Sequence, residues 1–293
     1  MRLISLVSLT MVAFAANSVL GRLAIGGSYM EANLFGLLRL LSGAGVLLLL
    51  CRLQNVALPW APVQTLWGGG ALTLYIVGFS MAYQDLDAGL GALILFGVVQ
   101  VAMFGWGAMR GAVVSAGQIA GAVLALMGLA IVVWPTSDAV VAPFTATVLM
   151  TLAGIGWAAY SLLGRSATAP LATTAINFAA ATVIMLPLSF VLATDVVVSV
   201  EGVLLALLSG AVTSGLGYAL WYAVLPALSA AVAATVQLSV PVLAILAGAL
   251  LLGEDIGLRL ALGSVAVLGG IAVVIRLAPP KPKPVSPEAM VKR

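Results

Sequence analysis

Histidine is absent from the 293-residue sequence, and cysteine occurs once, as Cys51. Histidine is the side chain most used for proton transfer near neutral pH and for binding transition metals. A single cysteine excludes an intramolecular disulfide bond. No metal site and no cofactor are therefore expected. The chain also offers few of the paired acid and base groups that enzyme chemistry needs, so the sequence predicts a protein that is not an enzyme.

Charged residues are also scarce. They make up 7% of the chain, whereas hydrophobic residues make up 63% and the mean hydropathy is +1.23. A soluble fold must show water a substantial polar coat, so this composition predicts an integral membrane protein. The apolar runs are long and continuous, without the alternation of β-barrel strands. One helical crossing takes about 20 apolar residues, so roughly ten crossings fit.

The apolar runs between charged residues, prolines and glycine-rich breaks predict an all-α membrane protein with ten transmembrane helices. Their expected ranges are about 3–25, 32–52, 62–84, 88–109, 115–134, 145–164, 171–193, 201–223, 227–251 and 257–276. The connections are too short for a soluble domain, so a functional site must lie among the helices. Residues 279–293 are rich in proline and lysine and predict a disordered cytoplasmic tail.

Basic residues concentrate on one side of this arrangement. If the N-terminus is cytoplasmic, most arginines and lysines fall in the cytoplasm and most acidic residues fall outside, as in membrane proteins generally. The exceptions are Arg22, Arg39, Arg259 and Glu288. The pattern predicts that both termini are cytoplasmic. It also favours ten helices, because a miscounted helix would mix the two sets of charges.

Segments of the first half of the chain recur in the second half. Ser18–Arg22 recurs as Ser161–Arg165, 143 positions later, and Gly121–Ala130 aligns with Gly263–Ala272 at an offset of 142. The order of the matched segments is preserved. We therefore interpret the chain as a duplicated unit.

The duplication predicts two five-helix repeats, residues 1–138 and 139–278. Tyr83 and Tyr222 match near the middle of each repeat, at an offset of 139. Since five is an odd number, the second repeat must enter the membrane inverted relative to the first. Many secondary transporters build alternating access from such inverted repeats, with the substrate held near the midplane between them.

The segment Pro241–Gly248, followed by Leu252–Glu254, Gly263 and Gly269–Gly270, resembles the end of the second repeat of the drug/metabolite transporter superfamily, in its EamA-type branch. The resemblance covers nearly the whole chain. It implies a ten-helix inverted-repeat transporter with a central cavity. Bacterial members that export amino acids, including aromatic ones, are the most similar type.

The first repeat departs from this pattern at two places. Gly111 and Ala112 stand where Gly253 and Glu254 stand in the second repeat, and no proline aligns with Pro241. The departures leave the expected fold unchanged and bear on the substrate. A carboxylate relay for protons has no candidate at the middle of any predicted helix, which favours uniport down a gradient or coupling through other groups.

Aromatic and amide side chains gather within several predicted helices. An amide that faced lipid would cost free energy, so these amides are expected to face other helices or a cavity. Each aromatic residue could instead serve packing or an interfacial belt, and Tyr83, Tyr222, Trp60 and Trp134 are the belt candidates. The candidate substrate-binding residues are Asn17, Tyr75, Phe79, Gln100, Trp157, Tyr160, Tyr218, Gln237 and Ser239.

Arg39 and Pro241 are the remaining candidates. Arg39 lies about seven residues into the second predicted helix, roughly 10 Å deep at the helical rise. It could contact a substrate carboxylate, but we favour the alternative that it snorkels outward or pairs with an acid such as Glu31. Pro241 removes a backbone donor, and a hinge and a static kink are equally consistent with it.

An apolar cavity with aromatic walls and a few amides suits an amphipathic solute with a ring or a branched side chain. We therefore expect an exporter of amino acids, aromatic or bulky hydrophobic, and of related small amphipathic metabolites. The alternative is a broad drug or nucleobase exporter of the same fold; a pore or a structural role is a weaker one. The expected setting is a monomer in a bacterial inner membrane, with lipid and a small-molecule substrate as partners and no nucleic acid.

Overall fold

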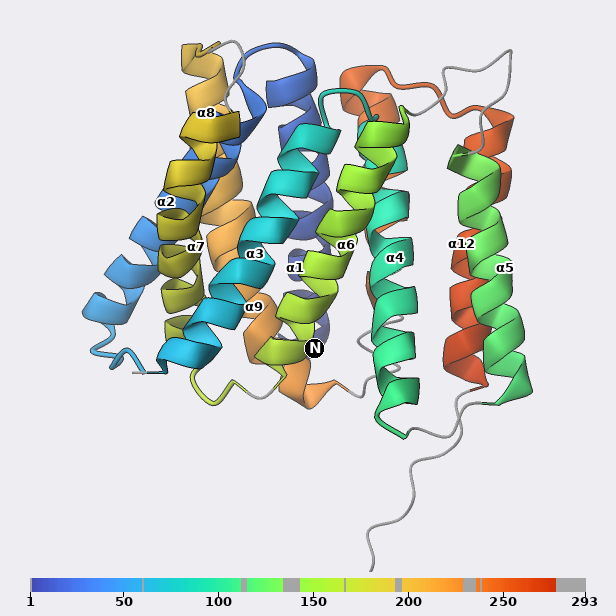
Figure 1. Cartoon of the computed structure of the whole chain (residues 1–293), viewed down its shortest axis with the longest axis horizontal. Helices are drawn as coiled ribbons and strands as arrows, with labels where there is room; N and C mark the ends of the chain where they lie inside the picture. Colours follow the sequence, from blue (N-terminus) through green and yellow to red (C-terminus); the bar gives the residue numbers. More distant parts are fainter. Residues whose placement is uncertain are drawn as a thin grey trace, which may run out of the picture.

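The computed structural model describes residues 2–59, 61–111, 115–133, 143–165, 167–192, 197–228, 236–237 and 239–277. These residues form a set of helices that lie side by side (Figure 1). Seven helical stretches are long and apolar enough to cross a membrane, and three shorter apolar ones accompany them. The prediction of an all-helical membrane protein is confirmed. Trp60, Trp134 and the predicted tail lie outside the described residues.

The helices follow nine of the predicted ranges closely, and of the range 227–251 the structure describes residues 227–228, 236–237 and 239–251. Three of the ranges contain π-helical turns. The elements in chain order are α1 (Arg2–Gly21), η1 (Arg22–Gly26), α2 (Ala32–Leu53), α3 (Pro62–Ala82), α4 (Ala88–Met109), α5 (Ala116–Val133), α6 (Phe144–Gly164), α7 (Pro170–Leu192), α8 (Val200–Leu208), η2 (Ser209–Leu216), α9 (Gly217–Val224), η3 (Leu225–Ala227), α11 (Ser239–Ala247), η4 (Gly248–Leu252) and α12 (Leu258–Arg276). The π-turns η1, η2 and η4 each contain glycine, which disfavours a regular helix.

Polar residues at the helix starts satisfy backbone N–H groups that have no partner inside the helix. The Glu31 carboxylate accepts hydrogen bonds from the amides of Asn33 and Leu34 at 2.9 and 2.8 Å, and so caps α2. Ser199 caps α8 through the amide of Gly202 at 3.0 Å. Pro62 starts α3, where its missing N–H costs nothing. These caps mark where the apolar runs begin.

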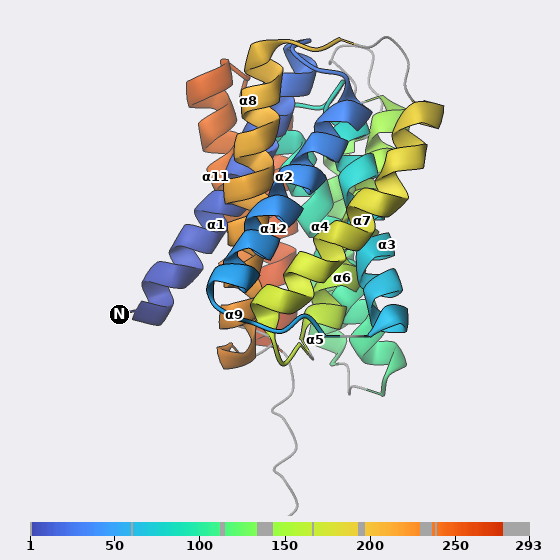
Figure 2. The same ribbon diagram turned by 90° about the vertical axis from the view of Figure 1, so that its left-hand side faces the viewer.

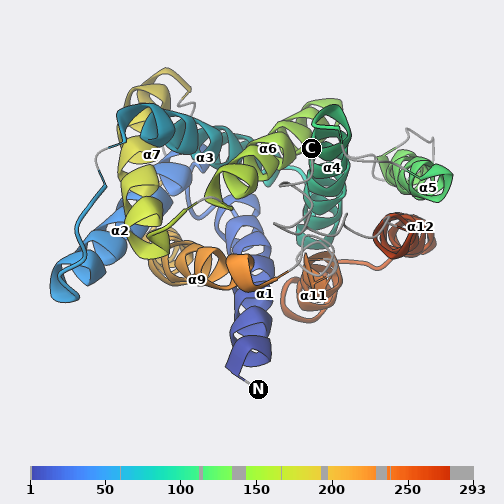
Figure 3. The same cartoon turned by 90° about the horizontal axis from the view of Figure 1, so that it is seen from below.

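The helices divide into a main bundle and an outlying pair. Viewed along the helices, α5 and α12 lie beside each other at one edge, next to α4 and α11 (Figure 3). In the main bundle, α3 packs against α6 and α7, and α2 packs against α7 and η2 (Figure 2). The helix α1 packs against α9 and α11, which lie far from it in the sequence.

Glycines allow α5 and α12 to approach closely. A methyl group added at Gly121 would come 2.6 Å from the carbonyl oxygen of Gly270, and one added at Gly128 would come 2.9 Å from the carbonyl oxygen of Gly263. Small residues permit this kind of close helix contact in membranes, where the hydrophobic effect does not drive helices together. The contact joins the two segments that match in sequence.

Candidate substrate-binding site

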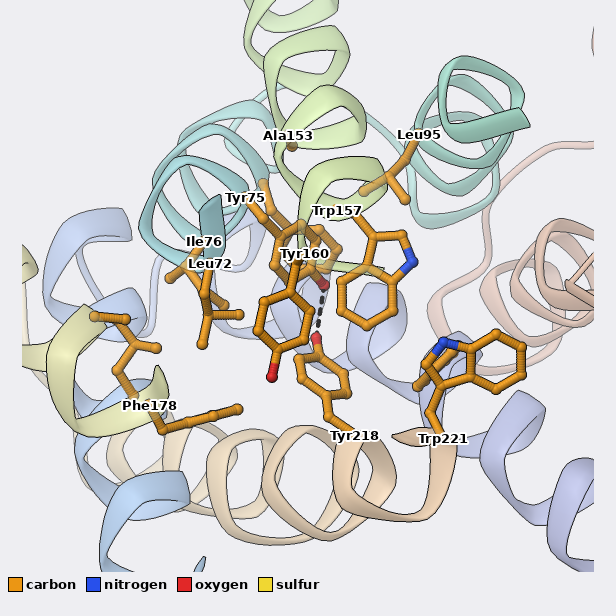
Figure 4. Packing of buried hydrophobic residues seen from close by; sticks show 14 of the residues in the cluster. Leu72, Tyr75, Ile76, Leu95, Ala153, Trp157, Tyr160, Phe178, Tyr218 and Trp221 are labelled. Carbon is orange, nitrogen blue, oxygen red and sulfur yellow. Dashed lines mark hydrogen bonds between the residues drawn. The ribbon is translucent and has the colours of Figure 1, made fainter. Parts of the chain in front are cut away.

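Aromatic side chains from α1, α3, α6 and α9 meet at the centre of the main bundle, and Figure 4 shows those of Tyr75, Trp157 and Tyr218. Trp157 lies at the middle of the cluster, with its ring centroid 4.7 Å from that of Tyr218, 5.2 Å from Tyr75 and 5.3 Å from Phe14. All four side chains are at most 4% exposed. Such tilted and edge-on contacts stabilise aromatic pairs beyond the area they bury.

A small cavity lies inside this cluster. Only about 10 Å³ of it is open to the centre of a water-sized sphere, which is enough for about one water molecule. Its lining residues are Phe14, Asn17, Ser18, Tyr75, Phe79, Leu95, Phe96, Trp157 and Tyr218. The rings fill most of the space between the helices. A larger solute can occupy this position only if some of the rings move.

Arg39 of α2 lies against the outer side of two of these rings. Its guanidinium donates to the hydroxyls of Tyr75 at 3.0 Å and Tyr218 at 2.8 Å, and its Nε donates to Ser214 at 2.7 Å. The guanidinium carbon also lies 4.7 Å from the ring centroid of Phe79, a cation–π distance. The side chain is fully buried. The arginine therefore holds α2, α3 and the η2–α9 segment together.

The expectation that Arg39 snorkels outward or pairs with Glu31 is wrong. Its side chain is 0% exposed, and the Glu31 carboxylate instead caps the start of α2. A snorkelling arginine would need to reach the polar edge of the bilayer. Here the tyrosine and serine hydroxyls supply polar partners inside the bundle, so the guanidinium stays there.

Asn17 organises a second polar cluster beside the cavity. Its Oδ1 accepts from Ser209 at 2.9 Å and from Ser214 at 3.1 Å, and also from the Thr213 hydroxyl, while its Nδ2 donates to the Thr213 carbonyl at 3.3 Å. A π-helix completes a turn in about five residues, so residues 209 and 214 lie on the same face of η2. The π-turn is what brings these hydroxyls together on Asn17.

The predicted candidates do not all converge. Asn17, Tyr75, Phe79, Trp157 and Tyr218 line the central cavity. Tyr160 lies behind them, and its ring centroid is 5.7 Å from that of Trp157.

Gln100 and Gln237 are buried but do not line this cavity, and the Ser239 hydroxyl donates to the Val236 carbonyl at 2.6 Å. Pro241 is the third residue of α11 as described, and residues 236–237 are also helical. Contact of Gln100, Gln237 and Ser239 with substrate stays a prediction, and so does a hinge at Pro241.

The hydroxyl cluster on η2 was missed by sequence reasoning. Ser209, Thr213 and Ser214 are at most 7% exposed and contact the candidate Asn17. Three hydroxyl residues within six positions of an apolar span were a usable signal, since polar groups inside a membrane face other helices or cavities. The helical period assumed for an α-helix would not place them on one face.

The proposed interfacial belt is wrong for the two tyrosines that the structure describes. Tyr83 and Tyr222 are 0% exposed. Their hydroxyls donate to the carbonyls of Ala88 at 3.2 Å and Tyr160 at 2.8 Å. Each ring lies over a glycine, Gly21 or Gly164. The absent side chain of Gly164 leaves room for the Tyr222 ring, and that of Gly91 leaves room for the Tyr83 ring.

A cluster of charged side chains near Tyr83 joins η1 to the segments that contain Asp87 and Glu254. Arg22 of η1 forms ion pairs with Asp87 at 3.4 Å and Glu254 at 3.8 Å. Glu254 also accepts from the backbone amide of Ala88 at 2.8 Å. Burial raises the pKa of the Glu254 carboxyl, and the nearby charge of Asp87 raises it further. We call this the Arg22 end.

The opposite end of the bundle, near Tyr222, is hollow. A cavity there has about 270 Å³ open to the centre of a water-sized sphere, compared with about 10 Å³ at the centre. It lies between α3, α6 and α7, and its lining residues are Pro59, Ala61, Gln64, Thr65, Gly68, Leu163, Ala167, Thr168, Thr173, Ile176, Asn177 and Tyr222. We call this the Tyr222 end.

Known proteins resemble the chain at three levels. Residues 144–276 match the model of the EamA-like transporter family. An uncharacterized protein of Pseudomonas aeruginosa is 45% identical over 275 residues, which cover 94% of each chain. A crystal structure of another protein superimposes with a TM-score of 0.68 at 18% identity, over 92% of this chain and 99% of that one. At that identity the likeness concerns the fold alone.

Proposed function

Because the chain belongs to the EamA-like transporter family and is therefore a multi-pass membrane transporter of the drug/metabolite type, we propose that it exports amino acids and related small amphipathic metabolites. The substrate has an aromatic or bulky apolar body and binds at the central aromatic cavity. The observation that carries the proposal is the convergence of Phe14, Tyr75, Trp157 and Tyr218 from four helices on that cavity. Aromatic walls with a few polar groups suit such a solute.

Matching positions of the two halves support an alternating-access mechanism. Phe14 and Trp157 are separated by the same 143 positions as the repeated Ser18–Arg22 motif, and their rings pack at 5.3 Å. Phe79 and Tyr218 are separated by the 139 positions that relate Tyr83 to Tyr222, and both line the cavity. The cavity is thus built from equivalent residues, as expected between inverted repeats.

The pairing of α5 with α12 supports the same arrangement. Gly121 and Gly128 match Gly263 and Gly270 at an offset of 142. Gly121 meets Gly270, and Gly128 meets Gly263. Such exchanged contacts are expected when two equivalent helices cross around a two-fold axis. We propose repeats of residues 1–138 and 139–278 in a 5+5 arrangement of ten helices.

The charge distribution supports an orientation in a bacterial inner membrane. Asp87 and Glu254 lie at the Arg22 end, whereas Arg110, Arg165 and Arg276 follow helices that finish at the opposite side. The positive-inside preference then puts the Arg22 end outside and both termini in the cytoplasm. In this orientation the hollow Tyr222 end receives substrate from the cytoplasm, as export requires.

Counterflow in proteoliposomes tests the proposal. Labelled phenylalanine, tryptophan, threonine and methionine are offered to the purified chain, with drugs and nucleobases as competitors. Trp157→Ala should lower kcat/KM for the preferred solute by about tenfold or more, because a buried aromatic contact is lost. Trp67→Ala is the matched control, since Trp67 is 68% exposed on α3. If no amino acid shows saturable flux, amino acids are excluded as the substrate class.

A further inference from the structure

Three buried hydrogen-bond donors beside the central cavity are left without an acceptor among the described residues. The hydroxyl of Tyr75 accepts from both Arg39 and Tyr218, so its own proton remains for another acceptor. The indole Nε1 of Trp157 and the Nη1 of Arg39 are buried and have no hydrogen-bond partner among the described residues. A buried donor without a partner is costly. Tyr75 and Trp157 line the cavity and Arg39 does not, so acceptor atoms of a ligand would meet donors of the first two residues, with the Arg39 charge behind the Tyr75 ring.

The strongest acceptor beside the cavity is already in use. The Oδ1 of Asn17 receives hydrogen bonds from Ser209, Thr213 and Ser214. An amide oxygen has two lone pairs, so it has no capacity left for an incoming ammonium group. The polar groups of the site are therefore complementary to an acceptor and not to a donor.

The charge of the site points the same way. Arg39 is fully buried, and none of the acidic residues that the structure describes forms an ion pair with it. An arginine stays protonated even when buried. Among the described residues, the guanidinium has only hydroxyls and aromatic faces as partners, so none of the described acidic groups compensates its positive charge in this low-dielectric interior. An anion would neutralise it.

We propose that the central site selects monoanionic carboxylates with an apolar or aromatic body over zwitterionic amino acids and over amines. The carboxylate takes the free donor of Tyr75, whose hydroxyl is hydrogen-bonded to Arg39, and the apolar body packs on Phe14 and Phe79. A zwitterion would leave the net charge unchanged and bring an ammonium towards Arg39. The inference rests on the part of the proposed function that places the substrate in this cavity, and it narrows the preferred substrates from amino acids to related monoanionic metabolites.

Three ligands with one ring and different charges test this selection. The full chain in detergent is titrated with 3-phenylpropionate, phenylalanine and phenethylamine, and binding is followed by isothermal titration calorimetry. The expected order is 3-phenylpropionate, then phenylalanine at least about tenfold weaker, then phenethylamine without saturable binding, because buried charge–charge contacts dominate the difference. Equal or tighter binding of phenylalanine or phenethylamine would overturn the proposal.

Two variants separate the contribution of the Arg39 charge to binding from that of the Tyr75 hydroxyl. Arg39→Gln should weaken 3-phenylpropionate binding by about a hundredfold and phenylalanine by less, whereas Arg110→Gln, at an exposed arginine of the same charge, should change neither. Tyr75→Phe keeps the Arg39 charge and its hydrogen bonds to Tyr218 and Ser214, covers the case that Arg39→Gln does not fold, and should weaken carboxylate binding by about tenfold. Unchanged affinity of Tyr75→Phe would contradict the proposed contact.

The two proposals fail differently. If phenylalanine shows saturable counterflow and binds better than 3-phenylpropionate, the proposed function stands and the selection for monoanions is overturned. If no ligand of the series binds and no amino acid shows counterflow, both are overturned. If 3-phenylpropionate alone binds and shows counterflow, the selection is supported and amino acids are removed from the proposed function.

Discussion

The two ends of the bundle share a tyrosine–glycine contact but differ in their ion pairs and in the cavity between their helices. At each end a buried tyrosine lies over a glycine of the matching motif, Tyr83 over Gly21 and Tyr222 over Gly164. Among the described residues, the ion pairs lie at the Arg22 end, whereas the cavity of about 270 Å³ lies at the Tyr222 end. The comparison indicates that the tyrosine–glycine contact belongs to both repeats, whereas charge closes one end. The conformation described is shut at the Arg22 end.

The largest effect is expected from a substitution that places a methyl group against the Tyr222 ring. Gly164→Ala would overlap this ring, whereas Gly21→Ala would approach the Tyr83 ring at 3.4 Å and Phe79 at 3.1 Å. Overpacking costs about 1–3 kcal/mol, so Gly164→Ala should lower the melting temperature and transport rate most and Gly21→Ala less. Gly45→Ala, with open space around it, is the control. Equal loss for Gly21→Ala and Gly164→Ala would show that the two contacts are equally tight.

Removing the charge of Arg22 should open the Arg22 end. Arg22→Gln loses the ion pairs with Asp87 and Glu254. A partly buried pair contributes about 1 kcal/mol, so the open population should rise by roughly fivefold. The measurement is the rate of thiol labelling of Ser18→Cys, a cavity residue, in a Cys51→Ser background. Arg110→Gln, at an exposed arginine that follows α4, should leave the rate unchanged.

A smaller effect is expected from pH at the same end. Burial raises the pKa of Glu254 in the closed state, so the closed state binds a proton more readily than an open state with a hydrated carboxyl. Lowering the pH from neutral towards the ordinary glutamate pKa should therefore slow labelling of Ser18→Cys from the Arg22 end. The pH dependence should vanish in Glu254→Gln. Faster labelling at low pH would mean that ion-pair loss outweighs burial.

Much of the fold could be predicted because lipid imposes a simple rule on each helix. Continuous apolar runs gave the helix ranges to within a few residues, and helix caps such as Glu31 lie where those runs begin. The π-turn η2 was not predicted, because hydrophobicity carries no information about whether a turn closes after four or five residues. That turn decides which hydroxyls reach Asn17.

The candidate site could be predicted only in part, because some of its contacts join residues that are far apart in the sequence. Aromatic spacing on α3 and α9 pointed to Tyr75 and Tyr218, since residues four apart share a helix face. The position of Arg39 depends on partners 36 to 179 residues away, which no local pattern reveals. Interfacial tyrosines and buried tyrosines have the same local sequence, so Tyr83 and Tyr222 were misassigned for the same reason.

The most direct test of the account is substrate protection of the central cavity. In a Cys51→Ser background, thiol labelling of Ser18→Cys is measured against increasing substrate, with Leu250→Cys, at an 83% exposed position, as the control. The account predicts protection of residue 18 alone, with half-maximal effect at the concentration that half-saturates transport. Labelling at residue 18 that saturating substrate leaves unchanged, while transport proceeds, would contradict it.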